Sequence, residues 1–462
     1  MKKRRLSILL SIVMLFSLLP TTALAAAYPD HVRVFNESGT ITSLSDGQYL
    51  AANNASNAST GYDGSQTYVA RYDQSSGKLY LRDYHGTATH DMIFADGDLN
   101  IEVESDSSFT TSPTATGNLY GIRADGGKLN ISGSGKLTVT ANGSGNVYGI
   151  SAKKGVTISA PLAVTVGKNN VTENGSVHGI YAQSGAISLS GNDMTVTATG
   201  GAENAYGVYN EAQTSSSAAG NGNIAISGKL TVNLSSGNYN RGISSESGVI
   251  TLNSATVKIP SSYYYGIYNG NGNVVIKSSP DVDISSDISN NRGICTDTGG
   301  NLNIEDSTVK VSANGVAAGL KGNVSIKDST VELTLTANNY EVIRTGNSSA
   351  ANTIDLSTRG SVTLTASGEQ EYAMISGKVT LGTNTKYEKG TPNGNSYNGA
   401  YDTASGKTVL KFVHEATAPT ATVADVTIDG VKDSLISNKE VKITLTNDKF
   451  NAIAANTDVS SW

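Results

Sequence analysis

Residues 119–141 read Leu-Tyr-Gly-Ile-Arg-Ala, Asp-Gly-Gly, Lys-Leu-Asn-Ile-Ser, Gly-Ser-Gly and Lys-Leu-Thr-Val-Thr-Ala. Large apolar residues stand at every second position of three short segments, which is typical of β-strands with one buried face. The alternating pairs are Tyr120 with Ile122, Leu129 with Ile131, and Leu137 with Val139. Glycine-rich turns separate the segments, so this stretch predicts three strands joined by tight turns.

The first of these segments recurs along the chain as a Tyr-Gly-Ile box, in which only the glycine is constant. The eight boxes are centred on Gly121, Gly149, Gly179, Gly207, Gly242, Gly266, Gly293 and Gly319. Successive boxes stand 24 to 35 residues apart, with an average of about 28. A repeat of this length is typical of architectures in which neighbouring repeats bury one another's apolar faces.

Three strands in each repeat predict an all-β protein, a three-sided parallel β-helix of roughly ten coils, where a coil is one turn of the helix. A Greek-key sandwich would need hairpin turns and would have no fixed period. A propeller would need four strands and about 40 residues in each unit. The composition agrees with the β-helix, because 50 glycines and only 8 prolines suit many tight turns between short strands.

The two ends of the chain differ from the repeats, and we predict four parts. Residues 1–25 read as a signal peptide, with a retained membrane anchor as the alternative, because basic residues precede an apolar run too short to span a bilayer. Residues 26–90 are expected to form an N-terminal β cap, and residues 91–415 the parallel β-helix. Residues 416–462 read as the start of an immunoglobulin-like, β-sandwich-like module truncated at Trp462, or as a terminal strand pair.

The net charge and the cysteine content limit the cellular compartments and the binding partners that fit this chain. The net charge of −6 and the pI near 5.5 give no basic field, which argues against nucleic acid and anionic lipid as partners. Cys295 is the single cysteine, so no intramolecular disulfide can form, and the thiol reads as an apolar filler rather than a reactive site. We expect a secreted, extracellular protein associated with the cell surface, with no membrane span once the signal peptide is removed.

The acidic residues do not form an enzyme signature. The chain has no Asp-Asp pair, no Gly-His-Gly and no zinc-ligand cluster, and His178 reads as a variant of the box. Asp297, Glu305 and Asp306 are weak candidates for a calcium site, with solvated turns as the alternative. We therefore expect no catalytic residues, and calcium is the one cofactor left open.

Aromatic residues offer a better candidate site. The residue after each box isoleucine is expected on the outer face, and these residues form an outward column: Arg123, Ser151, Tyr181, Tyr209, Ser244, Tyr268, Cys295 and Lys321. Tyr181, Tyr209 and Tyr268 are candidate carbohydrate-binding residues, because flat rings on a rigid sheet can stack on sugar faces. A ladder that only covers the strands is the alternative. The tyrosines that begin the boxes are expected to pack inward or at a corner.

The run from Lys78-Leu-Tyr-Leu to Gly97-Asp-Leu-Asn-Ile-Glu-Val, with Tyr120-Gly-Ile-Arg-Ala to Lys136-Leu-Thr-Val, resembles exported β-helix surface proteins of Gram-positive bacteria. The resemblance covers about residues 70–380 and implies a pectate-lyase-like fold, because these proteins are related in fold to polysaccharide lyases. Some members are described as carbohydrate-binding, which implies a glycan ligand. The tail from Thr420 is similar to modules of large cell-surface proteins that carry wall anchors.

Three classes of function remain open from the sequence. The first is a non-catalytic, exported β-helix that binds polysaccharide or another glycan through an outward strand face. The second is a structural or adhesin stalk that contacts a host or cell-surface protein. The third is a polysaccharide lyase or hydrolase, which the missing acid pair disfavours.

Overall fold

The structure is a computed structural model that describes residues 28–111, 117–168, 175–199, 204–212, 222–235, 239–260, 264–285, 292–297, 299–313, 319–336, 341–345 and 351–415. Its contacts divide the chain into two units. Unit 1 comprises Met1–Ile224 and Gly228–Asn238, and unit 2 comprises Ala225–Ser227 and Tyr239–Trp462. The short strand β20 (Ile224–Ile226) falls at the division between them.

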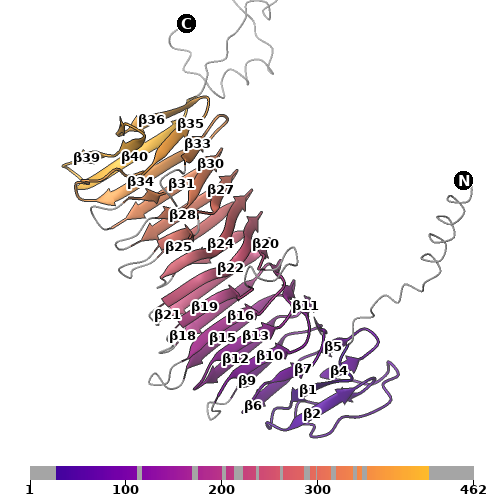
Figure 1. The fold of residues 1–462 in the computed structure, drawn as a ribbon. Helices are drawn as coiled ribbons and strands as arrows, with labels where there is room; N and C mark the ends of the chain where they lie inside the picture. The colour runs from indigo at the N-terminus through magenta and orange to yellow at the C-terminus, as the bar shows by residue number, and fades with distance from the viewer. Residues whose placement is uncertain are drawn as a thin grey trace, which may run out of the picture. The chain divides into compact units, whose positions relative to one another are not determined.

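Unit 1 is a three-sided parallel β-helix, and each side is a ladder of strands from successive coils. The first face consists of β7 (Ile93–Ala95), β10 (Leu119–Ala124), β13 (Val147–Ala152), β16 (Ser176–Ala182) and β19 (Asn204–Asn210). The second face consists of β8 (Leu99–Val103), β11 (Leu129–Gly133), β14 (Val156–Ile158) and β17 (Ile187–Leu189). The third face consists of β6 (His85–Ala88), β9 (Ser107–Thr111), β12 (Leu137–Gly143), β15 (Leu162–Lys168), β18 (Met194–Thr199) and β21 (Lys229–Ser235). Figure 1 shows the third-face strands side by side as successive rungs.

The register places equivalent residues of the repeats directly above one another. On the first face Ile122 pairs with Ile150, Ile150 with Ile180, and Ile180 with Val208. All four side chains are completely buried. Each coil therefore contributes one layer to a continuous apolar core, which no single repeat could build alone.

Antiparallel strands precede the first full coil. They are β1 (His31–Phe35), β2 (Ile41–Ser45), β3 (Tyr49–Leu50), β4 (Ala70–Asp73) and β5 (Lys78–Leu81). β1 pairs with β2 and with β7, and the second pairing sets Arg33 opposite Phe94. β3, β4 and β5 form a meander whose last strand runs parallel to β8. These strands occupy an edge that would otherwise be open to pairing with another chain.

Unit 2 repeats the three-sided arrangement. Its first and second faces share two long strands and continue in shorter ones: β22 (Tyr239–Asn253), β24 (Tyr265–Lys277), β26 (Arg292–Thr296), β27 (Asn301–Glu305), β29 (Leu320–Lys321), β30 (Asn323–Lys327), β32 (Ile343–Arg344), β33 (Ala351–Asp355) and β35 (Lys378–Leu381). The third face consists of β23 (Thr256–Ile259), β25 (Asp281–Ser285), β28 (Thr308–Ala313), β31 (Thr330–Leu335) and β34 (Ser361–Ser367).

Antiparallel strands also end the ladder of unit 2. The last strand, β40 (Lys407–His414), pairs antiparallel with β34, and it buries Leu410 and Phe412 completely. Its other partners are β36 (Thr385–Lys389) and β39 (Ala400–Asp402), and a separate pair is formed by β37 (Thr391–Asn393) and β38 (Ser396–Asn398).

The prediction of an all-β parallel β-helix is confirmed, with about nine turns where the sequence suggests roughly ten. The expected signal peptide at 1–25 and the expected immunoglobulin-like module at 416–462 lie outside the described residues. Within the described residues, the structure contains no helix that is both long and apolar enough to cross a membrane.

Candidate functional site

Each Tyr-Gly-Ile box bends its strand so that two consecutive residues face inward. In β10, Gly121 and Ile122 are both buried, whereas Tyr120 and Arg123 on either side are half-buried. Strict alternation would have put Tyr120 on the same side as Ile122. The bend shifts the alternation by one residue, so Tyr120 and Arg123 both lie on the outer face.

Close approach of neighbouring atoms explains the glycine at this bend. A Cβ atom on Gly121 would lie 2.5 Å from the carbonyl oxygen of Gly149 in the next coil and 2.5 Å from Cγ1 of Val139 on the third face. Gly179 and Gly293 have equally close neighbours. At these three positions the glycine is therefore required because there is no space for a side chain, and not because of a positive φ.

The residues that begin the boxes form a stacked aromatic ladder in unit 1. They were expected inward or at a corner, and the structure places them at the bend, on its outer side. The rings of Tyr120, Tyr148, His178 and Tyr206 stack with centroids 4.6, 4.6 and 4.9 Å apart and planes within 7°. This spacing equals the distance between strands of about 4.8 Å. The inner rings of the ladder therefore cover each other's faces, and each stacked pair contributes about 0.5–1.5 kcal/mol.

The outward column lies beside this ladder, with the register that the sequence predicts. Arg123 pairs with Ser151, Ser151 with Tyr181, and Tyr181 with Tyr209. Tyr209 is only 9% exposed, because its ring packs 4.4 Å from that of Tyr206. Tyr181 stays half-buried and is tilted 60° from the Tyr148 ring. Of these two candidate carbohydrate-binding tyrosines, Tyr181 is the one with an accessible ring.

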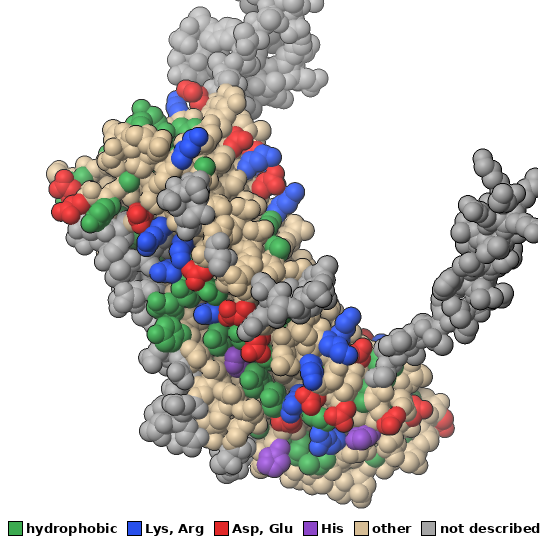
Figure 2. Space-filling view, in the orientation of Figure 1, with side chains coloured by type: hydrophobic (Ala, Val, Ile, Leu, Met, Phe, Trp, Pro, Cys, Tyr) green, Lys and Arg blue, Asp and Glu red, His purple; other side chains and the backbone are tan. Residues whose placement is uncertain are grey.

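A recess opens beside Tyr181 because the column residue one coil earlier is small. We call it the Ser151 recess; it has a volume of about 250 Å³. Arg123, Ser151 and Tyr181 follow one another along it on three successive coils, and Tyr120 and Tyr148 of the ladder form part of its wall. The rest of its lining is formed by Ala124 and Ala152 and by the polar residues that directly follow the three strands: Asp125, Lys153 and Gln183. Figure 2 shows this kind of mixed surface, with green, blue and red side chains together over β10, β13 and β16.

Charged groups hold the recess in shape. The Arg123 guanidinium lies 2.7 Å from Asp125 Oδ1 and 3.6 Å from Asp91 Oδ2, and it also covers the Tyr120 ring at 4.4 Å. Lys153 is exposed and forms no ion pair within the described part of the chain. An ammonium group without a carboxylate partner is free to bind a ligand oxygen.

The hydroxyl group of Tyr181 is fixed at one end of the recess. It donates a hydrogen bond to Glu211 Oε2. Burial, and then this hydrogen bond, raise the pKa of Tyr181 well above its usual range. The phenol therefore stays neutral and its orientation is set by Glu211.

Tyr268, the third candidate, lies in unit 2 in a different setting. The Arg241 guanidinium covers its ring at 4.1 Å, and its hydroxyl donates to Asp297 Oδ2 at 3.0 Å. Cys295, completely buried, packs against Tyr268 and Tyr265. Tyr268 is only 8% exposed, so the structure leaves no open ring face for a sugar here.

The three acidic candidates for calcium each lie beside a basic side chain. Asp297 Oδ1 is 2.5 Å from Lys321 Nζ, Glu305 lies between two lysines, and Asp306 pairs with Arg359. Burial alone would raise the pKa of Asp297, but Lys321 and the Tyr268 hydroxyl hold it below its usual range. Among the described residues, no three His, Cys, Asp or Glu side chains are grouped as metal ligands would be.

The wall of the recess is not evident from the sequence. Tyr120 and Tyr148 were assigned away from the site, because alternation was carried through the glycine without allowing for the bend. The available signal was the constant glycine itself, since a position that tolerates no side chain can point inward next to another inward residue.

Comparison with protein-family models, with curated proteins and with solved structures gives no match for this chain.

Proposed function

We propose that this chain is an exported, non-catalytic β-helix that binds polysaccharide or another glycan through the Ser151 recess. The observation that supports this most is the recess itself, a polar hollow with an accessible tyrosine ring on a rigid sheet. Sites built on strands hold their groups in place better than sites on loops. The proposal keeps Tyr181 as a contact residue and replaces Tyr209 and Tyr268 with Tyr148, Arg123 and Lys153.

The chemistry of the recess suits a sugar ring. Sugar hydroxyls both donate and accept hydrogen bonds, and Arg123, Lys153 and Gln183 supply donors while Asp125 supplies an acceptor. The tilted Tyr181 ring supplies an apolar surface for the carbon-bound hydrogens of the sugar. The volume of about 250 Å³ is below the usual range for drug-sized ligands, which favours one sugar unit of a longer chain.

The contacts of Asp91 and Asp125 with Arg123 support binding without catalysis. A glycosidase needs two carboxyl groups on opposite sides of the scissile bond, with different protonation states. Asp91 and Asp125 instead share the Arg123 guanidinium, which positions them as supports for that side chain. The same geometry favours the binding function over the lyase or hydrolase alternative.

The proposal also includes the setting of the protein. The leader expected at residues 1–25 supports export to the cell surface, and the resemblance to Gram-positive surface proteins with a pectate-lyase-like fold supports a glycan ligand. The stalk function, with contact to a host or cell-surface protein, is the alternative that would remain if no glycan bound. No metal is part of the proposed contact, so binding is expected to survive a chelator.

A pull-down on insoluble polysaccharides, followed by a glycan array, tests the proposal. Tyr181→Ala removes the accessible ring and is expected to lower retention at least tenfold. Tyr372→Ala is the matched control, because Tyr372 is 59% exposed and lies in unit 2, outside the recess. Equal retention of wild type and Tyr181→Ala would rule the recess out as the binding site.

A further inference from the structure

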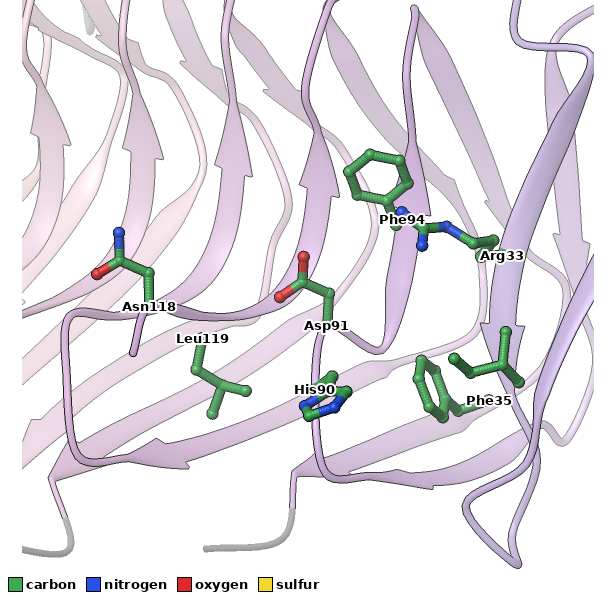
Figure 3. Close-up of a pocket in the computed structure, with 8 residues that line it drawn as sticks. Arg33, Phe35, His90, Asp91, Phe94, Asn118 and Leu119 are labelled. Atoms are coloured by element: carbon green, nitrogen blue, oxygen red, sulfur yellow. The ribbon is translucent and has the colours of Figure 1, made fainter. Parts of the chain in front are cut away.

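A second cavity lies in unit 1, where β1 meets the first coil. Its volume is about 220 Å³, and Figure 3 shows Phe35, His90 and Leu119 on one side of it and Arg33, Phe94 and Asp91 on the other. It is separate from the Ser151 recess, with which it shares no lining residue. We call it the β1 cavity.

The cationic group of the β1 cavity is Arg33. Because β1 pairs with β7, Arg33 stands directly opposite Phe94, and its guanidinium covers the Phe94 ring at 3.9 Å (Figure 3). Stacking on a ring face holds the guanidinium flat and leaves its N–H edge available. Arg33 forms no ion pair within the described ranges, although carboxylates are the usual partners of a half-buried guanidinium.

The anionic group of the β1 cavity is Asp91. Its Oδ1 accepts a hydrogen bond from the backbone N–H of Tyr120 at 3.2 Å, and its Oδ2 lies 3.6 Å from Arg123 Nη1. Both contacts come from β10, and together they orient the carboxylate. Burial raises the pKa of Asp91, while Arg123 and Arg33 act in the opposite direction. Opposite charges on Arg33 and Asp91 therefore line one cavity without pairing with each other.

The apolar side of the β1 cavity contains a large side chain in contact with water. Phe35 and Leu119 are almost completely buried, but Ile41 on the same lining is 48% exposed. Ile41 therefore offers exposed apolar surface next to the cavity. A ligand that covered Ile41 would remove that surface from water.

We propose that the β1 cavity binds a free α-amino acid with an apolar side chain. The ligand carboxylate pairs with the N–H edge of Arg33, and its ammonium group pairs with Asp91. The apolar side chain lies over Phe35, Ile41 and Leu119. A zwitterion is the ligand class that places an opposite charge beside each of these two groups at once, whereas a simple anion would face Asp91 and a simple cation would face Arg33.

Isothermal titration calorimetry of the full chain with L-leucine tests this proposal. L-leucine is expected to bind, and two analogues are expected to bind at least tenfold more weakly. N-acetyl-L-leucine lacks the ammonium group that faces Asp91, and L-leucinamide lacks the carboxylate that faces Arg33. No binding heat from L-leucine, L-methionine or L-phenylalanine at about 10 mM would overturn the proposal, because even a millimolar site would then be largely filled. Equal affinity for all three leucine ligands would also overturn it.

Substitutions at Arg33 and Asp91 test whether L-leucine binds in the β1 cavity. Arg33→Gln and Asp91→Asn are each expected to weaken L-leucine binding at least tenfold, and unchanged affinity in both would overturn the assignment. Lys153→Gln, which alters only the Ser151 recess, is the matched control and is expected to bind L-leucine like the wild type. If either variant fails to fold, the comparison of L-leucine with N-acetyl-L-leucine and L-leucinamide on the wild type still tests the proposal. Glycan retention by Arg33→Gln is expected to be normal, so the two proposals can fail independently.

Discussion

His178 shows how one residue of a repeat adapts to its surroundings. It occupies a position that is tyrosine in three of the four rungs of the ladder, between the rings of Tyr148 and Tyr206. Burial lowers the pKa of His178 to about 3, so the imidazole stays neutral in the folded protein. Its Nδ1 has no hydrogen-bond partner within the described residues. The His178 ring therefore packs between its two aromatic neighbours as a neutral group.

The lowered pKa of His178 predicts a pH-dependent stability. The unfolded imidazole titrates near 6.5, so below that pH the unfolded state binds a proton that the folded state does not. Stability is therefore lost as pH falls from about 6.5 towards 3, by up to about 2 kcal/mol at pH 5. His178→Tyr restores the common ladder residue and is expected to reduce the drop in Tm between pH 7.5 and pH 5. His31→Gln, at an exposed position of β1, serves as the control, and an equal drop in all three proteins would contradict this account.

Cys295 gives a second prediction at the residue scale. The thiol is completely buried against Tyr265 and Tyr268, and burial raises its pKa to about 11. Since the thiolate is the reactive form, the folded protein is expected to resist iodoacetamide at pH 8 and to react once unfolded. Rapid stoichiometric labelling of the folded protein would show that the thiol is accessible.

At the scale of single elements, the bend in each box decides where the side chains of the first face point. The sequence predicts the strand, its partners and the outward column, because these depend on a period of two and on the repeat length. It does not predict that Gly121 and Ile122 both face inward. This arrangement depends on Val139, which belongs to another strand and lies close to the glycine. The recess escapes prediction for a related reason: Ser151 makes a hollow only because Arg123 and Tyr181 stand on the coils before and after it.

Two box glycines of unit 2 provide a matched test of this packing. A Cβ atom on Gly293 would lie 2.3 Å from Val311 Cγ1 and 2.4 Å from Gly319 O, whereas one on Gly319 would be no closer than 3.3 Å to Val342 O. Gly293→Ala is expected to destabilise unit 2 by about 1–3 kcal/mol, the usual cost of overpacking. Gly319→Ala is expected to cost less than about 1 kcal/mol. Denaturant unfolding measures both, and equal costs would contradict the steric explanation of the box.

For the whole molecule, stability depends on stacking coils and on closing the ladder ends. The repeat predicted the stacking, but the division into two units at Ile224 and Tyr239 has no equally clear signal in the sequence. At the end of unit 2, β40 runs antiparallel along β34 and covers an edge that could pair with another chain. The sequence indicated that the ends differ from the repeats, but the antiparallel pairing needs the three-dimensional register.

The closing strand gives a prediction at this scale. Phe412 of β40 is completely buried, and Phe412→Ala is expected to cost about 3–5 kcal/mol and to loosen the strand from β34. The exposed edge should then promote association, seen as larger species in light scattering. Lys411→Ala, which changes a half-buried neighbour on the same strand, is expected to remain like the wild type. A monodisperse Phe412→Ala protein would show that β40 does not protect the edge.

The affinity of Ser151→Tyr for the glycan that the wild type retains is the most direct test of whether the Ser151 recess binds a glycan. The column already holds tyrosine at the next two coils, so the fold is expected to accept this change while the new ring fills the recess. We predict at least tenfold weaker binding, equal to a loss of about 1.4 kcal/mol, with Tyr372→Ala unchanged. Undiminished binding by Ser151→Tyr, or no glycan bound by the wild type on the array, would contradict the account.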